Sequence, residues 1–384
     1  MEKKIMLLAA VFLLLEVSNA AAAWAENTAS DDNVRLKQEV MDLKSKINGI
    51  EKRLVQNTQS APGPIPSFLS GIGISGGISG GPFYAKNPEP GTSDNEFLLS
   101  NFLVELSSTC ENAPVGFAAA FGETSTPSIL DIPETNPNFD IKYGSLTFKP
   151  SANLSLEAGL LQPIAGYECT YTYDNKNIMS GALASQQPYN AYGAWLGYDV
   201  SDMNVYAGYY KTRLDNEEYA ENESPLDDSW EIGLGGEVSD MKFNIYHYHL
   251  AGMRNLTGAL ADYTIGNVDV GVNADYWNWE SNQKTDVNRK YSMGGAVYVC
   301  PHFDKFSIPV RLEYIDQGES RIYIDSMDAK RIYTATISPT YHFCEKTYAR
   351  VESAYVNAVG AFVNKDGEPK NHQVCLAAEI GYIF

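Results

Sequence analysis

Two short motifs near residue 75 have the spacing of loops that bind cofactors or carry nucleophiles. They are a dinucleotide-type pattern and a nucleophile-elbow pattern, formed by Gly71, Gly73 and Gly76 and by Gly73, Ser75 and Gly77. Both chemistries need a strand that turns directly into a helix, because the start of that helix positions the phosphate or the serine. Here Ile78, Ser79 and more glycines follow, which favours a strand of small side chains. We therefore predict no catalytic residues and no enzyme activity.

Histidine and cysteine are the other residues that could bind a metal. His247 and His249 are two apart, so they share one face of a strand, but the sequence indicates no third ligand. The five cysteines fit neither a zinc site nor a redox motif, and their odd number leaves at least one unpaired. A disulfide between Cys300 and Cys344 stays open in an exported protein. We predict no metal and no cofactor.

The acidic charge of the chain is confined to its larger part. The net charge is −20, and the charges of residues 1–25 and of residues 26–60 each sum to zero. All of the excess therefore lies in residues 61–384. Nucleic acid is not expected as a partner, because phosphate binding needs clustered lysine and arginine. An acidic interior that favours cations is compatible with this distribution.

The N-terminal part reads as three segments that precede the main domain. Residues 1–25 form a signal peptide, with Lys3 and Lys4 before an apolar run and cleavage after Ala25 or after Ala20. Residues 26–60 form a coiled-coil helix, whose heptad seam comprises Leu36, Val40, Leu43, Ile47, Ile50 and Leu54. Residues 61–66 form a Pro-rich linker. The alternative for the helix is amphipathic packing on its own domain.

Residues 67–384 consist of segments with two-residue alternation, separated by turn residues. We predict sixteen strands: 67–82, 97–107, 115–122, 140–149, 153–162, 191–199, 203–213, 228–238, 241–250, 254–264, 266–280, 289–300, 306–318, 329–342, 345–357 and 371–384. Tight turns alternate with longer connections, which is typical of outer-membrane barrels. The predicted fold is all-β, a transmembrane antiparallel β-barrel of about 16 strands with a short N-terminal coiled-coil helix. A soluble β-sandwich is the alternative.

Alternation also predicts which side chains face lipid. In residues 306–314 the apolar set includes Leu312 and Tyr314, while Arg311 and Glu313 lie on the other face. A charge facing lipid at mid-membrane costs about 2–4 kcal/mol for Lys or Arg, so the charged face is the lumen. Facing is ambiguous in residues 140–149, 241–250 and 254–264. The inward acidic residues outnumber the basic ones by nine to three: Glu157, Asp199, Glu231, Glu237, Asp269, Asp275, Glu313, Glu352 and Glu379 against Lys290, Arg311 and Arg350.

Several motifs resemble a known family. Residues 156–168 read L-E-A-G-L-L-Q-P-I-A-G-Y-E, followed by Asn175 and by Gln187-Pro188-Tyr189; later, residues 334–341 precede Arg350-Val351-Glu352. These stretches are similar to the OmpL-like family of β-barrel porins over most of residues 97–384. The chain departs from it at Leu161-Gln162-Pro163, where the family usually has threonine, and in its N-terminal heptads. The resemblance implies a passive pore and no particular substrate. The last strand, ending in Tyr382 and Phe384, resembles the assembly signal of outer-membrane barrels.

In general porins the third loop folds inward, and residues 163–190 are the third long loop here. We predict that this loop, with Glu168, Asp174 and Lys176, constricts the lumen opposite Arg311, Arg350, Glu352 and Glu379. An exposed surface loop is the alternative. The full predicted pore-lining set is Glu157, Glu168, Asp174, Lys176, Asp269, Asp275, Arg311, Glu313, Arg350, Glu352 and Glu379.

The expected function is that of a water-filled, weakly cation-preferring porin in the bacterial outer membrane, with its coiled coil on the periplasmic side. The expected partners are outer-membrane lipid, small hydrophilic solutes and ions, the barrel-assembly machinery, and further copies of the chain in a trimer. A structural outer-membrane protein, with a plugged barrel linked to the cell wall through the coiled coil, is the alternative.

Overall fold

The computed structural model describes residues 72–87, 95–108, 114–130, 139–162, 164–188, 190–213, 226–250, 254–279, 291–318, 329–364 and 367–384. Residues 71–384 form one compact unit. The segments predicted as signal peptide, coiled coil and linker, and the start of the first predicted strand, lie outside the described residues.

Eighteen strand segments form a single sheet. They are β1 (Ile72–Lys86), β2 (Asn95–Ser108), β3 (Val115–Thr124), β4 (Asp140–Phe148), β5 (Leu154–Leu161), β6 (Ala191–Val200), β7 (Met203–Arg213), β8 (Leu226–Val238), β9 (Met241–Leu250), β10 (Arg254–Ile265), β11 (Val268–Trp279), β12 (Tyr291–Phe303), β13 (Phe306–Ser307), β14 (Val310–Asp316), β15 (Arg331–Ile337), β16 (Thr340–Cys344), β17 (Thr347–Val363) and β18 (Pro369–Ile383).

Two of the wall strands are each interrupted by a proline. Pro309 separates β13 from β14, and Pro339 separates β15 from β16, because proline has no N–H to donate to a sheet ladder. The proline carbonyls stay in the sheet: Pro309 O accepts from Ser338 N at 2.9 Å, and Pro339 O accepts from Val351 N at 3.1 Å. Counted as continuous strands, the eighteen segments make sixteen.

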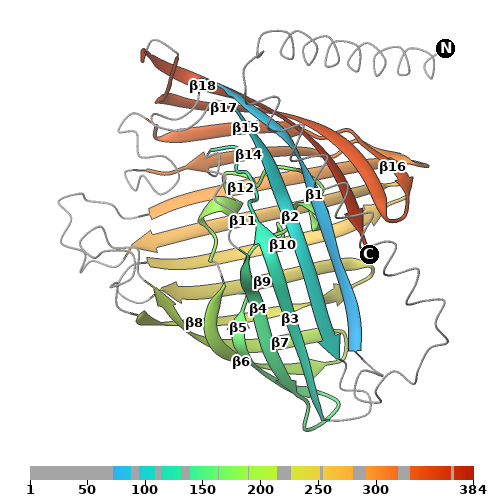
Figure 1. Cartoon of the computed structure of the whole chain (residues 1–384). Coiled ribbons are helices and arrows are strands. Elements are labelled where there is room, and N and C mark those ends of the chain that lie inside the picture. Colours follow the sequence, from blue (N-terminus) through green and yellow to red (C-terminus); the bar gives the residue numbers. More distant parts are fainter. Residues whose placement is uncertain are drawn as a thin grey trace, which may run out of the picture. The chain divides into compact units, whose positions relative to one another are not determined.

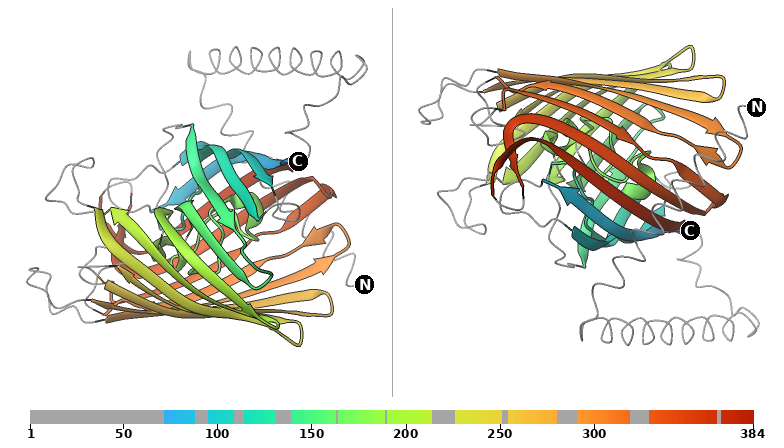
Figure 2. Two further views of the ribbon diagram at one scale, coloured as in Figure 1. Left: turned by 90° about the horizontal axis from the view of Figure 1, so that it is seen from below. Right: turned by 90° about the horizontal axis from the view of Figure 1, so that it is seen from above.

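The sheet closes on itself into a barrel (Figures 1 and 2). Each strand pairs antiparallel with its neighbour in sequence, and β1 also pairs antiparallel with β18, from Gly77 opposite Ile383 to Lys86 opposite Val374. The predicted sixteen-stranded antiparallel barrel is confirmed. The largest difference from the predicted bounds is in β17, which continues past residue 357 to Val363. A register shift between Asn357 and Phe362 interrupts the alternation there, and Gly360 supplies a positive φ of 69°.

The two ends of the barrel differ in the length of their connections. At one end the strands are joined by tight turns, with positive φ at Ser201, Ser239, Asp240, Gly266 and Asp304, as two-residue hairpins require. We call this the short-turn end; β1 begins and β18 ends there. The opposite end, which we call the long-loop end, includes the connection between β5 and β6.

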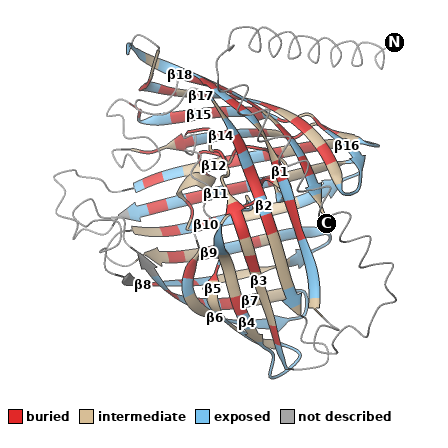
Figure 3. Cartoon of the chain, viewed as in Figure 1, coloured by how far each residue is buried: buried red, intermediate tan, exposed pale blue. Residues whose placement is uncertain are grey.

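Exposed and buried residues alternate along the strands (Figure 3), as expected for a wall with one face outward and one face inward. Leu312 is 52% exposed on the outside, whereas Arg311 on the same strand is fully buried. In β9, one of the ambiguous strands, Tyr246 and Tyr248 face inward and are buried, so His247 and His249 face outward. Among the described residues, no helix is both long and apolar enough to cross a membrane.

Candidate functional site

The connection between β5 and β6 lies inside the barrel (Figure 2). Residues 164–188 carry two short 3-10 helices, η2 (Thr172–Asp174) and η3 (Ala184–Gln186). A segment from the connection between β3 and β4 runs beside this loop: Ser180 N donates to Pro127 O at 2.8 Å, and Ile129 N donates to Ser180 O at 3.1 Å. We call residues 164–188 the inner loop. Its contacts with the wall define the candidate site.

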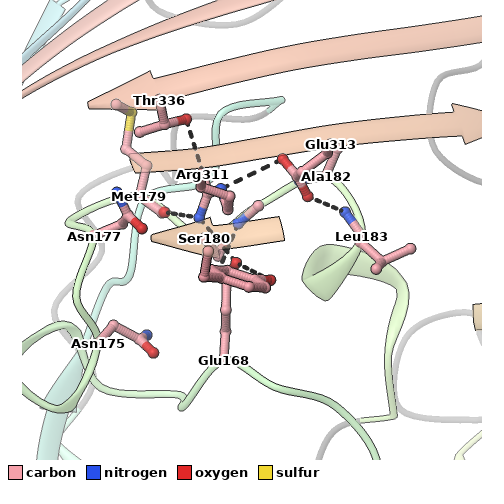
Figure 4. A network of polar contacts seen from close by, with 12 residues as sticks. Glu168, Asn175, Asn177, Met179, Ser180, Ala182, Leu183, Arg311, Glu313 and Thr336 are labelled. Atoms are coloured by element: carbon pink, nitrogen blue, oxygen red, sulfur yellow. Dashed lines mark hydrogen bonds and ion pairs between the residues drawn. The ribbon is translucent and has the colours of Figure 1, made fainter. Parts of the chain in front are cut away.

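Arg311 of β14 is the central cation of the site (Figure 4). Its Nη1 donates to Glu168 Oε1 and to the carbonyl of Met179, both at 2.9 Å, and its Nε lies 3.4 Å from Glu313 Oε2. Glu168 also accepts from Gly181 N at 2.8 Å and from the Tyr298 hydroxyl at 3.0 Å. The Arg311 side chain is fully buried. One guanidinium therefore joins a wall carboxylate, a loop carboxylate and the loop backbone.

Two wall carboxylates bind the loop backbone directly. Glu313 Oε1 accepts from Leu183 N at 2.9 Å and its Oε2 from Ala182 N at 3.2 Å. Glu352 of β17 accepts from Ile178 N at 2.6 Å and from Met179 N at 2.9 Å. Each carboxylate satisfies two consecutive N–H groups that would otherwise be buried without partners. Hydrogen bonds to an ionised acceptor are about twice as strong as neutral ones, so these residues anchor the loop.

A second arginine binds the turn at η2. Arg350 of β17 pairs with Glu379 of β18, with 2.7 Å between Nε and Oε2. The same guanidinium donates to the carbonyls of Thr172 at 2.6 Å and Asn175 at 2.7 Å. Thr172 Oγ1 in turn donates to Glu379 Oε1 at 2.5 Å. The late part of the wall thus holds the loop in two places, at η2 and before η3.

The wall from β8 to β11 contributes further anchors. Asp275 accepts from Gln187 Nε2 at 2.8 Å, and Asp269 pairs with Lys176 at 2.9 Å. Glu231 accepts from Ile164 N at 3.2 Å and from the Tyr210 hydroxyl at 3.0 Å. Alternation with Trp230 and Ile232 places Glu231 inside, but the predicted constriction set omits it.

The lumen is not lined by polar groups alone, contrary to the water-filled interior expected from alternation. Apolar side chains of the inner loop are buried against inward apolar side chains of the wall; they are Ile178, Met179, Ala182 and Leu183, and the wall partners include Leu256, Trp277, Ile315, Ile332 and Val356. Apolar residues can face the lumen because loop and wall exclude water from each other's surface.

The wall from β2 to β5 holds a different group of side chains. Glu105 of β2 accepts from the Tyr143 hydroxyl at 3.3 Å and from Ser75 Oγ at 3.2 Å. Glu157 of β5 accepts from Ser145, and Tyr143 lies in the electrostatic field of Glu105, Glu157 and the loop residue Asp174. We call Glu105, Glu157 and Asp174 the acidic cluster. Among the residues that the structure describes, none of the three forms an ion pair with lysine or arginine.

Asp174 differs from an ordinary surface carboxylate. Partial burial in the lumen, followed by repulsion from Glu105, raises the pKa of Asp174 to about 6. The predictions omit Glu105 because Leu103 obscures the alternation beside it: Leu103 faces inward and packs on Tyr171 of the inner loop. The outward triplet Phe102, Val104 and Leu106 carries the signal that could have placed Glu105 inside.

The residues predicted as an assembly signal lie at the short-turn end. Tyr382 and Phe384 face outward, and their rings stack with centroids 6.5 Å apart. Phe384 and Gly76 form two backbone hydrogen bonds: Phe384 N donates to Gly76 O at 3.0 Å, and Gly76 N donates to Phe384 O at 3.2 Å. These contacts join the two ends of the barrel sheet.

A closed sixteen-stranded antiparallel wall with the connection between β5 and β6 folded inside it defines a porin-type outer-membrane barrel. The chain belongs to the family described as "Putative beta-barrel porin-2, OmpL-like", whose profile matches residues 71–384. No curated protein sequence matches the chain.

Several solved outer-membrane structures share the fold at low sequence identity. A loop-deletion mutant of OmpT from Vibrio cholerae has a TM-score of 0.55 and 13% identity, over 82% of this chain and 99% of that one. The anion-selective porin from Comamonas acidovorans has a TM-score of 0.54 and 9% identity, over 82% and 99%. The outer membrane channel DcaP of Acinetobacter baumannii has a TM-score of 0.53 and 11% identity, over 82% of this chain and 97% of that one. Family and fold support an outer-membrane location.

Proposed function

We propose that this protein is a passive outer-membrane channel for small hydrophilic solutes and ions, with a weak preference for cations. One observation carries the proposal: charged groups of the wall from β8 to β18 hold the inner loop, whereas Glu105 and Glu157 of the opposite wall, together with Asp174 of the loop, lie without a described basic partner. Arg311 and Arg350 are buried in contacts with Glu168, Glu313 and Glu379. The side chains of the acidic cluster remain accessible to solvent. Ions would pass between the inner loop and the wall from β2 to β5.

The preference for cations should be weak. Salt screens charges beyond about 10 Å at 0.1 M, so three carboxylates cannot control the whole cross-section of a wet pore. The fold itself does not determine the sign of selectivity, since the Comamonas acidovorans porin of this fold is anion-selective. The sign must therefore come from the side chains at the constriction.

The assembly of the channel forms a second part of the proposal. We propose a trimer in outer-membrane lipid, in line with the similar OmpT from Vibrio cholerae, which has a trimer form. Tyr382 and Phe384 would be read by the barrel-assembly machinery, and residues 26–60 would lie in the periplasm as a coiled coil. Deleting residues 26–60 should then lower the stability of the oligomer and leave conductance intact.

Reconstitution of the purified protein into planar bilayers tests the channel. We expect conductance steps and, under a KCl gradient, a reversal potential of the sign that favours potassium. A heat-modifiability gel on the same sample shows whether the barrel is folded. A folded barrel without conductance steps, or with a reversal potential that favours chloride, would refute the proposal.

The apolar packing between the inner loop and the wall favours a second candidate function. A barrel plugged by this loop would be a structural protein, tied to the cell wall by its coiled coil. This candidate predicts closed channels together with retention of the protein on peptidoglycan. The bilayer experiment therefore separates the two candidates directly.

A further inference from the structure

Three side chains of the kinds that bind transition metals converge in the lumen near the short-turn end. They are Asp269 of β11 and Cys300 and His302 of β12, and one ligand atom of each lies within 4.8 Å of the others. All three face inward. His302 and Asp269 are partly open to solvent, with side-chain exposures of 46% and 22%, while Cys300 is buried. A cation could therefore reach the cluster from the mouth of the barrel.

The sheet itself brings these ligands together. Cys300 and His302 are two residues apart, so both point to the same face of β12. Asp269 is the direct cross-strand partner of Cys300, and such partners have Cβ atoms about 5 Å apart. The site is hard to predict from the sequence, because Asp269 near the start of β11 and Cys300 near the end of β12 are far apart in the chain and meet only through strand pairing. The two histidines that attract attention in the sequence, His247 and His249, face outward instead.

The chemistry of the three donors suits one class of ion. A thiolate, an imidazole and a carboxylate are ligands of zinc and related divalent transition metals, whereas calcium and magnesium require oxygen donors. Zinc sites with three protein ligands keep a fourth position for water. Ligand atoms around one zinc lie about 3.5 Å apart, given metal–ligand bonds of about 2.0–2.3 Å. Small side-chain rotations would close the present cluster to that geometry.

A positive charge already occupies one side of the cluster. Asp269 Oδ2 lies 2.9 Å from Nζ of Lys176, a residue of the inner loop, and 2.9 Å from Nε2 of His302. Asp269 Oδ1 accepts from Thr264 Oγ1 at 2.9 Å. A divalent ion that binds Asp269 and His302 must displace the Lys176 ammonium. Metal and lysine therefore compete for the same carboxylate.

We propose that Asp269, Cys300 and His302 form a binding site for a zinc-like divalent transition metal, and that Lys176 limits its affinity by competition. Metal binding at this site does not require an open pore, because the donors bind the ion whether or not the barrel conducts. It sits under the inner loop, so an occupied site would release one anchor of that loop.

Cobalt(II) titration of the full-length, reduced protein in detergent under argon tests the site. We expect one equivalent of cobalt to bind, with a thiolate-to-cobalt charge-transfer band and the visible bands of four-coordinate cobalt. Zinc should displace the cobalt and remove both signals. Cys300→Ser should abolish the charge-transfer band, and Asp269→Asn and His302→Ala should weaken binding at least tenfold. Lys176→Met should strengthen it severalfold.

Matched variants separate this site from other thiols and histidines. Cys344→Ser and Cys169→Ser remove exposed thiols, and His249→Ala removes an outward histidine; all three should bind cobalt like the unaltered chain. Heat-modifiability gels confirm that every variant folds. The proposal fails if folded, reduced protein shows no thiolate band, if Cys300→Ser retains it, or if Cys344→Ser loses it. Unchanged affinity in Lys176→Met would contradict competition at Asp269.

Discussion

The two sides of the lumen treat the same loop differently. On the wall from β14 to β18, arginines and glutamates are buried. They form ion pairs, and they accept hydrogen bonds from the loop backbone or donate hydrogen bonds to it. On the wall from β2 to β5, Glu105 and Glu157 lie near Asp174 of the loop, and none of the three carboxylates has a described basic partner. Both sides are rich in charge, but only the first uses its charge for structure.

This difference separates two roles that composition cannot distinguish. An inward charge that is paired and buried holds the loop, while an inward charge in contact with water can act on a passing ion. Counting nine acidic against three basic inward residues mixes the two roles. The predictions that follow test each side separately, from the largest expected effect to the smallest.

Arg311→Ala should have the largest effect. It leaves Glu168 and Glu313 buried without their shared cation, and breaking a buried pair in this way costs about 3–5 kcal/mol. The inner loop should leave the wall, so single-channel conductance should rise. Arg331→Ala is the matched control, because the Arg331 side chain is 64% exposed and its ion pair with Asp316 is long, at 3.8 Å. Unchanged conductance in a folded Arg311→Ala barrel would show that the loop is held by other contacts.

Neutralising the acidic cluster should change selectivity and leave the loop in place. In water a carboxylate attracts a monovalent cation at 4 Å by about 1 kcal/mol, or about fivefold in relative permeability. The double variant Glu105→Gln, Glu157→Gln should therefore reduce the potassium-to-chloride permeability ratio at least about fivefold at low salt. Reversal potentials measure this ratio, with Glu368→Gln as an exposed control. An unaltered ratio would place the selective region elsewhere.

Acidification should produce a smaller decrease in the potassium-to-chloride permeability ratio. The pKa of Asp174 is raised to about 6 by burial and by Glu105, so this residue loses its charge as the pH falls through 6. The cation preference should decline there, well above the ordinary aspartate pKa of about 4. The raised pKa also means that ionised Asp174 weakens the docked loop as the pH rises through this range. Asp174→Asn should remove the step, and its persistence would assign the step to another group.

The smallest effect is expected from Gly77→Ala. A Cβ at Gly77 would lie 2.9 Å from the ring of Tyr173, so the ring must move within the lumen. Conductance should change by less than about twofold, since one ring shifts while the charged anchors stay intact. Gly295→Ala is the control, because its Cβ would approach no atom closer than 3.5 Å. A large change would mean that Tyr173 itself sets the width of the pore.

Most of the wall could be predicted from the sequence, because a strand between lipid and lumen must alternate in polarity. The strand of Arg311 and Glu313 shows this clearly, since the outward residues beside them, Val310, Leu312 and Tyr314, are apolar or aromatic. The prediction of which side chains face inward was less certain where the inner loop packs against the wall. Tyr246, Tyr248 and Leu103 face inward although they are apolar or aromatic, because loop residues pack on them. Alternation in one strand carries no information about such a distant contact.

The site was predictable to a different degree on each side. Paired charges of opposite sign, Arg311 with Glu313 and Arg350 with Glu352, mark the late strands as the counterpart of an acidic loop. The structure redistributes these pairs, since Arg350 bonds to Glu379 and Glu352 bonds to loop backbone. Glu105 and the ligand set around Cys300 depend on register between strands, which a single sequence does not specify.

The anchors of the inner loop also constrain the order in which the protein can fold. Thr172 contacts Glu379 across 207 residues, and Ile178 contacts Glu352 across 174. The inner loop lies in the first half of the chain, but it can dock in its final position only after the last strands have formed. Contacts this distant in sequence form slowly, because a long stretch of chain must be ordered first. Until then, an unfinished barrel would expose the apolar side chains of Ile178, Met179 and Leu183 to any chaperone that escorts it.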